Sequence, residues 1–148
     1  MSKILSYRGL LADGGQDEIL LSTKKGEKGY RIIKLELMPY DFGTATAEQE
    51  SVVQVYKTEQ SGVTQIIDFS DNRTLGASII NNAANAYAYP TVLTTVFDNE
   101  IFNQDIYITH KNNHADVAPC NYYLELEVIP LNEMEATVAT LKDIRNNQ

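Results

Sequence analysis

Four residues of types that ligate metals or take part in nucleophilic catalysis lie between positions 110 and 120, namely His110, His114, Asp116 and Cys120. A cysteine beside a histidine base is a nucleophilic pair, and the same groups bind zinc. However, the spacing matches no standard zinc finger, and structural zinc sites usually have four Cys or His ligands. We therefore favour a surface loop of ordinary polar residues here, without a metal.

Paired carboxylates are a second source of chemistry. Glu125 and Glu127 share one face of an expected strand, and Glu36 lies on another, so an acid and base pair of the glycosidase kind is geometrically possible. One member would need burial to raise its pKa. Because these residues alternate with Leu and Val, we expect them to point to water and not to catalyse a reaction.

Two acidic segments, "DFSDN" at 68–72 and "FDNE" at 97–100, supply the oxygen ligands that calcium prefers. They lack the spacing of an EF-hand loop, so turn chemistry is the favoured interpretation and calcium the alternative. The chain also lacks the glycine patterns of phosphate and dinucleotide binding. The sequence therefore predicts no catalytic residues and no cofactor.

Two groups of residues are candidates for contact with a partner. One is a basic stretch that holds a single acid, Glu27, and so has a local balance of 5 − 1 = +4; its members are Lys24, Lys25, Lys28, Arg31 and Lys34. It could meet an acidic protein, although a solvated loop and strand edge is the simpler interpretation. The other is Tyr87 and Tyr89 in "NAYAYP". These rings could stack on a sugar or anchor a protein contact, and the alternative is packing under the loop.

Overall charge and composition exclude several classes of protein. With 12 basic and 20 acidic residues, the net charge is −8, which opposes binding to nucleic acid. No apolar run is long enough for a transmembrane helix or for the hydrophobic core of a signal peptide. The single cysteine excludes an intrachain disulfide. We therefore expect a soluble chain made in the cytoplasm, without nucleic-acid or membrane partners.

The elements that must position these residues are β-strands, because apolar residues alternate along most of the chain. Alternation predicts that one face of each strand is buried. The residues predicted to point inward come from four segments: Tyr122, Leu124, Leu126 and Val128; Ile33, Leu35 and Leu37; Val63, Ile67 and Phe69, with Asp68 outward; and Leu75, Ala77 and Ile79.

The segment "DNEIFNQDIYITHKN" (98–112) contains a further strand. Ile106 and Ile108 share a parity, so "DIYIT" is predicted to be a strand. The preceding "DNEIFNQ" is expected to be a bend whose polar residues satisfy backbone groups.

Two apolar runs are harder to orient. "VLTTVF" (92–97) is apolar on both parities, as in a strand covered on both sides or at an oligomer contact. "SVVQVYKT" (51–58) has strand composition but an ambiguous face.

Turn signals at short intervals separate these strands, and no helical periods lie between them. This pattern predicts one all-β domain over residues 1–148, an antiparallel two-sheet sandwich, jelly-roll-like, with eight or nine strands. The end of the chain is the exception. Asn132 and Glu135 form a capping-box-like start for a C-terminal helix, whereas the β-branched residues that follow favour a strand, so both alternatives remain open.

Four segments carry a resemblance: "IDFSDNRTL", "VFDNEIFNQDIYITHK", "CNYYLELEVIPL" and "EATVATLKDIR". Together they resemble small virion structural proteins of tailed phages of marine bacteria, cyanophages among them, over about residues 32–145. The resemblance implies a virion location and a non-enzymatic role, such as a capsid decoration protein bound to the major capsid protein or other virion proteins. Such proteins are expected to be homo-oligomers, commonly trimers. The alternative is a glycan- or receptor-binding sandwich of a tail or fibre.

Overall fold

The computed structural model describes residues 3–21, 28–41, 49–82 and 91–131, and these form eight β-strands without a helix. The strands are β1 (Lys3–Leu11), β2 (Gln16–Ile19), β3 (Lys28–Pro39), β4 (Gln49–Tyr56), β5 (Thr74–Asn82), β6 (Thr91–Phe97), β7 (Ile106–Asn112) and β8 (Cys120–Pro130). The predicted all-β fold is confirmed. The predicted C-terminal helix or strand lies outside the described residues.

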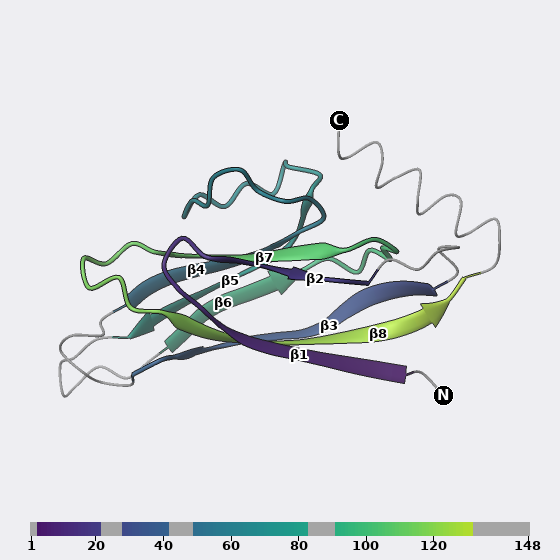
Figure 1. Ribbon diagram of the computed structural model, residues 1–148, viewed down its shortest axis with the longest axis horizontal. Helices are drawn as coiled ribbons and strands as arrows, with labels where there is room; N and C mark the ends of the chain where they lie inside the picture. Colours follow the sequence, from purple (N-terminus) through teal and green to yellow (C-terminus); the bar gives the residue numbers. More distant parts are fainter. Residues whose placement is uncertain (1–2, 22–27, 42–48, 83–90, 132–148) are drawn as a thin grey trace.

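The strands form two stacked antiparallel sheets (Figure 1). The three-stranded sheet has the order β1-β8-β3, and the five-stranded sheet has the order β2-β7-β4-β5-β6. The pairs β1/β8, β2/β7 and β4/β5 are nested in the way that a jelly roll nests them. The remaining pair of a jelly roll, β3/β6, is not hydrogen-bonded, because β6 joins the edge of β5 instead.

The core lies between the two sheets and is built from one parity of each strand. Tyr122, Leu124 and Leu126 of β8 are buried as predicted, and Val128 is partly buried against the core. Ile106 and Ile108 of β7, also predicted to share a face, are fully buried opposite them. Alternation therefore identified core residues of β7 and β8.

The predicted inward face of β3 was wrong at one position. A β-bulge between Ile32 and Lys34 places one extra residue in the strand. Ile32 is therefore buried, whereas Ile33 is only half-buried, and Leu35 and Leu37 lie in the core as predicted. A bulge of this kind shifts the parity by one residue, which simple alternation does not reveal.

A similar correction applies to β5. Leu75 and Ile80 belong to the core, whereas Ile79 is half-buried. Ala77 is buried, but it pairs with Gln54 on the outer face of the five-stranded sheet. A register shift in the ladder with β4 leaves Leu75 as the extra residue of β5, so Leu75 does not lie on the same face as Ala77 and Ile79.

The two ambiguous runs have different explanations. β4 is central and buried on both faces, with Val53 and Val55 in the core and Gln54 buried on the outer face. β6 is an edge strand, and Val96 is exposed, so the expectation that this run is covered on both sides was wrong for the single chain. The oligomer contact remains a prediction.

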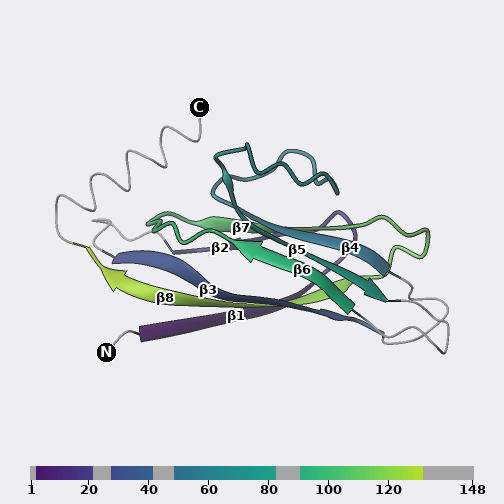
Figure 2. The same cartoon turned by 180° about the vertical axis from the view of Figure 1, so that it is seen from behind.

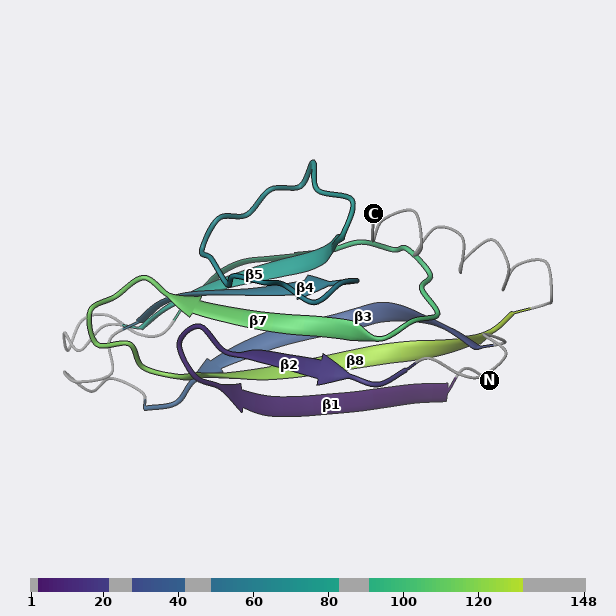
Figure 3. The same ribbon diagram turned by 45° about the horizontal axis from the view of Figure 1, so that its top comes forward.

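The predicted strand "VTQIIDF" does not form. Residues 57–73 instead make a long loop between β4 and β5, which rises above the five-stranded sheet (Figures 2 and 3). Ile67 and Phe69 are exposed instead of buried, and Asp68 is exposed as predicted.

The segment before β7 is a bend, as predicted. Asp105, which was predicted to begin the strand, precedes β7, and its Oδ1 accepts a hydrogen bond of 2.7 Å from the backbone N–H of Leu21. Phe102 is buried and bonds through its backbone to Tyr30 in both directions, at 2.7 and 2.9 Å. The stretch 98–112 is therefore a corner of the sandwich followed by a core strand.

Candidate functional site

The loop of residues 57–73 is fastened to the outer face of the five-stranded sheet. Gln16 of β2 donates from Nε2 to the Gln60 carbonyl at 3.2 Å and accepts from the Gln60 N–H at 2.9 Å. The buried Gln54 of β4 donates from Nε2 to the Ile66 carbonyl at 2.9 Å. Long glutamine side chains that project from the sheet therefore hold the loop at two points along its length.

The base of the loop is closed by backbone and charge. The Lys57 N–H donates to the Arg73 carbonyl at 2.8 Å. The Lys57 ammonium is almost completely buried and lies 2.5 Å from Glu100 Oε1. Arg73 forms an ion pair with Asp71 at 2.7 Å. The loop is thus held at its base and also at Gln60 and Ile66, although it contains no regular secondary structure.

The outer part of this loop exposes large apolar side chains. Ile66 is 67% exposed, Ile67 37% and Phe69 63%. We call these three residues the apolar crest. Loops longer than about 12–15 residues without secondary structure are usually functional or disordered, and this one is fastened by side-chain hydrogen bonds. An apolar group of this kind on a fixed loop is typical of a binding surface.

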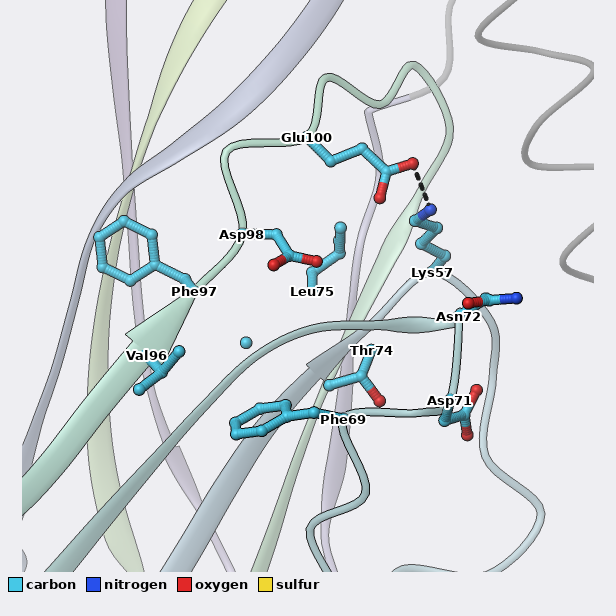
Figure 4. Close-up of a pocket in the computed structure, with 11 residues that line it drawn as sticks. Lys57, Phe69, Asp71, Asn72, Thr74, Leu75, Val96, Phe97, Asp98 and Glu100 are labelled. Atoms are coloured by element: carbon cyan, nitrogen blue, oxygen red, sulfur yellow. Dashed lines mark hydrogen bonds and ion pairs between the residues drawn. The ribbon is translucent and has the colours of Figure 1, made fainter.

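A pocket of about 390 Å³ lies between the loop and the end of β6 (Figure 4). Its lining comes from the loop (Lys57, Phe69, Asp71, Asn72), from β5 (Thr74, Leu75, Gly76), and from β6 and the bend after it (Val96, Phe97, Asp98, Glu100). Gly76 is required at the floor, because a Cβ atom there would lie 2.9 Å from the Cβ of Phe97. The crest residue Phe69 therefore forms part of the pocket wall.

The pocket is acidic, since Asp71, Asp98 and Glu100 outnumber Lys57, giving 1 − 3 = −2. The Arg73 guanidinium bonds to Asp71 and holds the pKa of that carboxyl below its usual value. At the neighbouring Asp68, hydrogen bonds from the Ser70 hydroxyl and N–H lower the pKa. These loop carboxylates are therefore ionised at neutral pH.

The two acidic segments considered for calcium do meet at this pocket. Asp71 and Asn72 come from the first, and Asp98 and Glu100 from the second. However, within the described ranges no group of three or more His, Cys, Asp or Glu side chains has an arrangement that could hold a metal ion. Asp71 and Glu100 are instead occupied by Arg73 and Lys57.

The structure corrects the surface-loop interpretation of His110 and Cys120. His110 lies in β7 and Cys120 in β8, and both side chains are fully buried. The His110 Nδ1 lies 3.0 Å from the Leu11 carbonyl, and its Nε2 lies 2.8 Å from the Ser51 hydroxyl. Burial lowers the pKa of His110 and raises that of Cys120 to about 12, so a thiolate is disfavoured.

His114 and Asp116 do lie in the loop between β7 and β8, 3.4 Å apart. The three carboxylates of the other candidate site, Glu36, Glu125 and Glu127, face outward from the three-stranded sheet as predicted. Glu127 bonds to Arg31 at 2.8 Å, and Glu125 accepts from the Tyr123 hydroxyl at 2.8 Å. These carboxylates therefore have surface partners.

The candidate partner contacts are only partly described. Lys24, Lys25, Tyr87 and Tyr89 lie outside the described residues, so they stay predictions. Lys28 begins β3 and is exposed. Arg31 is paired with Glu127, and Lys34 lies 3.6 Å from Glu36 and 5.9 Å from the centre of the Tyr123 ring. Glu127 on the neighbouring strand and Glu36 on the same strand thus offset part of the positive charge that the sequence concentrates at this stretch.

A second surface feature is a shallow hollow of about 800 Å³ on the outer face of the three-stranded sheet. The exposed Leu10 and Met38 line it, together with Arg8 and Glu36. No helix that is both long and apolar enough to cross a membrane occurs in the described part of the chain.

Sequence reasoning missed the apolar crest. The turn signals at 61 and 71 bracket Ile66, Ile67 and Phe69, and their partial alternation indicated a strand. The loop is fastened by Gln16 and Gln54, which are distant in the sequence and carry no motif. Only the tertiary arrangement distinguishes an apolar loop from an apolar strand here.

Comparison with protein-family models gives no match, and comparison with curated proteins also gives none. Among solved structures, the chain is similar to the crystal structure of Yersinia pseudotuberculosis-derived mitogen. The identity is 14%, the TM-score is 0.31, and the similarity covers 90% of this chain and 89% of that chain. A TM-score this low supports neither a shared function nor an equivalence of individual strands.

Proposed function

We propose that the protein is a non-enzymatic virion structural protein, a capsid decoration protein that binds the head of a tailed phage and stabilises it. The observation that carries the proposal is the apolar crest, because Ile66, Ile67 and Phe69 are exposed on a loop that is held in place. Exposed apolar side chains contribute favourable free energy only when a partner covers them and removes their surface from water. The sequence resemblance to virion proteins supports the choice of partner.

The loop suits binding because its backbone is already held in place before a partner binds. Its hydrogen bonds to Gln16 and Gln54 and the Lys57–Glu100 pair fix the backbone before a partner arrives. Binding then loses less conformational entropy than it would with a free loop. A decoration protein benefits from this, since bound copies stabilise the assembled shell by mass action.

The buried positions of His110 and Cys120 also favour a non-enzymatic role. Nucleophilic catalysis requires a reactive group that a substrate can reach, and both side chains are fully buried. The partner of the crest is the major capsid protein or another virion protein that presents an apolar recess. Because a shell repeats its surface, the bound protein is proposed to be a homo-oligomer, a trimer among the possibilities.

The role is tested by quantitative mass spectrometry of purified phage particles that encode this chain. The proposal predicts the chain in intact particles at a fixed ratio to the major capsid protein. Its presence only in the lysate, and not in purified particles, would remove the virion role.

The pocket beside Phe69 favours a second candidate, a glycan- or receptor-binding module of a tail or fibre. An exposed aromatic ring that lines the same pocket as Asn72 and Asp98 offers an apolar face and polar groups within one hollow. Glycan-array binding that is lost on Phe69→Ala would support this function at the pocket. Binding lost only on Tyr87→Ala and Tyr89→Ala would support the residues predicted from the sequence, and no glycan binding would exclude the function.

A further inference from the structure

The two sheets have four edge strands, and they differ in how well their open edges are protected. β2 has only four residues, Gln16–Ile19. β6 has a register shift in its ladder with β5. β3 contains a bulge, ends at Pro39, and has Tyr30 paired with Phe102 on its open side. Short length, bulges, proline and covering segments are the devices that prevent edges from pairing with other chains.

Within the described residues β1 has none of these four devices, and its only protective feature is the pair of charged side chains Lys3 and Arg8. It has nine residues, contains no proline, and pairs with β8 in an unbroken register from Lys3 to Leu11. No other described strand pairs with it, and it forms one border of the molecule in Figures 1 and 3. Its outer-face residues Ile4 and Leu10 are 54% and 47% exposed. A long, regular edge with exposed apolar side chains is suited to pairing with another strand.

The sequence of β1 is compatible with pairing to itself. An antiparallel pairing that uses all nine residues has its two-fold axis at Tyr7, because the paired positions must add up to 3 + 11 = 14. Ile4 then lies opposite Leu10 of the second copy, and Ser6 lies opposite Arg8. Opposite side chains have Cβ atoms about 4.5–5.5 Å apart. Each exposed apolar residue therefore meets an apolar residue, and no two like charges are opposed.

We infer that a second copy of this chain pairs with β1 along its open edge, forming a two-fold dimer with a continuous six-stranded sheet, β3-β8-β1-β1-β8-β3. The interface is isologous, since each copy contributes the same strand. Leu5 and Tyr7, which are partly buried against the core, gain further cover from the second copy. The inference goes beyond the proposed function and does not depend on it.

A charge exchange tests the interface. Sedimentation velocity should show the native chain at twice its 16.6 kDa mass. Two double variants, Ile4→Lys with Leu10→Lys and Ile4→Glu with Leu10→Glu, should each self-associate at least about tenfold more weakly, which corresponds to about 1.4 kcal/mol. Mixing the two variants should restore dimers, because unlike charges then lie opposite one another. Circular dichroism confirms that each variant is folded.

Disulfide trapping tests the register. Ser6→Cys and Arg8→Cys are both at exposed positions, and the native Cys120 is buried and does not compete. Mixed under air oxidation, the two variants should cross-link to one another, because positions 6 and 8 face each other. Each variant alone should cross-link poorly, since its two cysteines are on the diagonal, about 7–8 Å apart, beyond the usual reach of a disulfide.

The inference is overturned if the native chain is a monomer or a trimer. It is also overturned if the mixed charge variants fail to associate while both remain folded, or if the mixed cysteine variants cross-link no better than either alone. The inference is supported if the native chain is a dimer, if mixing the two charge variants restores dimers, and if cross-linking occurs only between positions 6 and 8.

Discussion

At the residue scale, the fold determines the chemistry of His110 by enclosing it. The Leu11 and Ala12 carbonyls, at 3.0 and 3.1 Å from Nδ1, can only accept, so Nδ1 carries the proton. Nε2 then accepts from the Ser51 hydroxyl, and Ser51 Oγ accepts from Gln49 Nε2 at 3.0 Å. Within this network the Ser51 hydroxyl proton has His110 Nε2 as its acceptor only when His110 is neutral, which makes His110 a structural group.

This network predicts a loss of stability in acid. Burial lowers the pKa of folded His110, and Lys111 adds to that effect, whereas the two carbonyls and Asp13 oppose it. In the unfolded chain the His110 imidazole has its ordinary pKa of about 6.5. Below that pH the unfolded chain therefore binds more protons at His110 than the folded chain does. The free energy of unfolding should therefore fall as the pH drops below about 6.5, until the folded pKa is reached. Urea unfolding at a series of pH values measures this.

Two variants separate His110 from other titrating groups. His110→Gln should lower stability at all pH values but reduce the difference between neutral and mildly acidic conditions. His114→Gln, which changes the other histidine of the chain, should leave the His110 dependence in place. An equal pH dependence in native protein and His110→Gln would contradict this assignment.

A second residue-scale prediction concerns the buried ammonium of Lys57. Glu100→Gln removes its carboxylate partner, and the cost of an uncompensated buried charge should be about 3 kcal/mol of unfolding free energy. The matched control is Glu36→Gln, which breaks the exposed pair with Lys34 and should cost less than about 1 kcal/mol. Chemical denaturation measures both. Equal losses of unfolding free energy in the two variants would show that the buried pair stabilises the fold no more than the exposed pair does.

At the element scale, most strands were predictable because alternation depends only on one sheet face being buried. β7 and β8 followed this rule, with Ile108 and Leu124 buried as expected. β3 and β5 departed from it at bulges, where one inserted residue reverses the parity. A bulge is stabilised by neighbouring strands, so the sequence of the strand alone does not reveal it.

The loop of residues 57–73 gives the prediction at this scale. Gln16→Ala combined with Gln54→Ala removes three hydrogen bonds that fasten the loop, each worth about 0.5–1.5 kcal/mol. Amide hydrogen exchange in the loop should accelerate at least about tenfold, whereas β8 should exchange at its native rate. Thr58→Ala is the control, because it changes only a bond within the loop. Unchanged loop exchange in the double variant would mean that the glutamines do not hold it.

At the scale of the whole molecule, the sandwich was predictable from strand spacing, but the candidate site was not. The acidic segments at 68–72 and 97–100 were visible in the sequence, yet their meeting at one pocket depends on β5 and β6 being neighbours. The Lys57–Glu100 pair likewise joins residues that are distant in the chain. Strand order is set by packing of the complete fold, which no local pattern encodes.

The central claim at this scale is that an exposed surface, the apolar crest, performs the function by binding the phage head. Co-sedimentation with heads that lack the protein tests it most directly. Ile66→Ser with Phe69→Ser should weaken binding at least about tenfold, and Leu20→Ser, which changes a residue that is 75% exposed outside the crest, should bind like the native chain. Equal binding by all three proteins would contradict the claim.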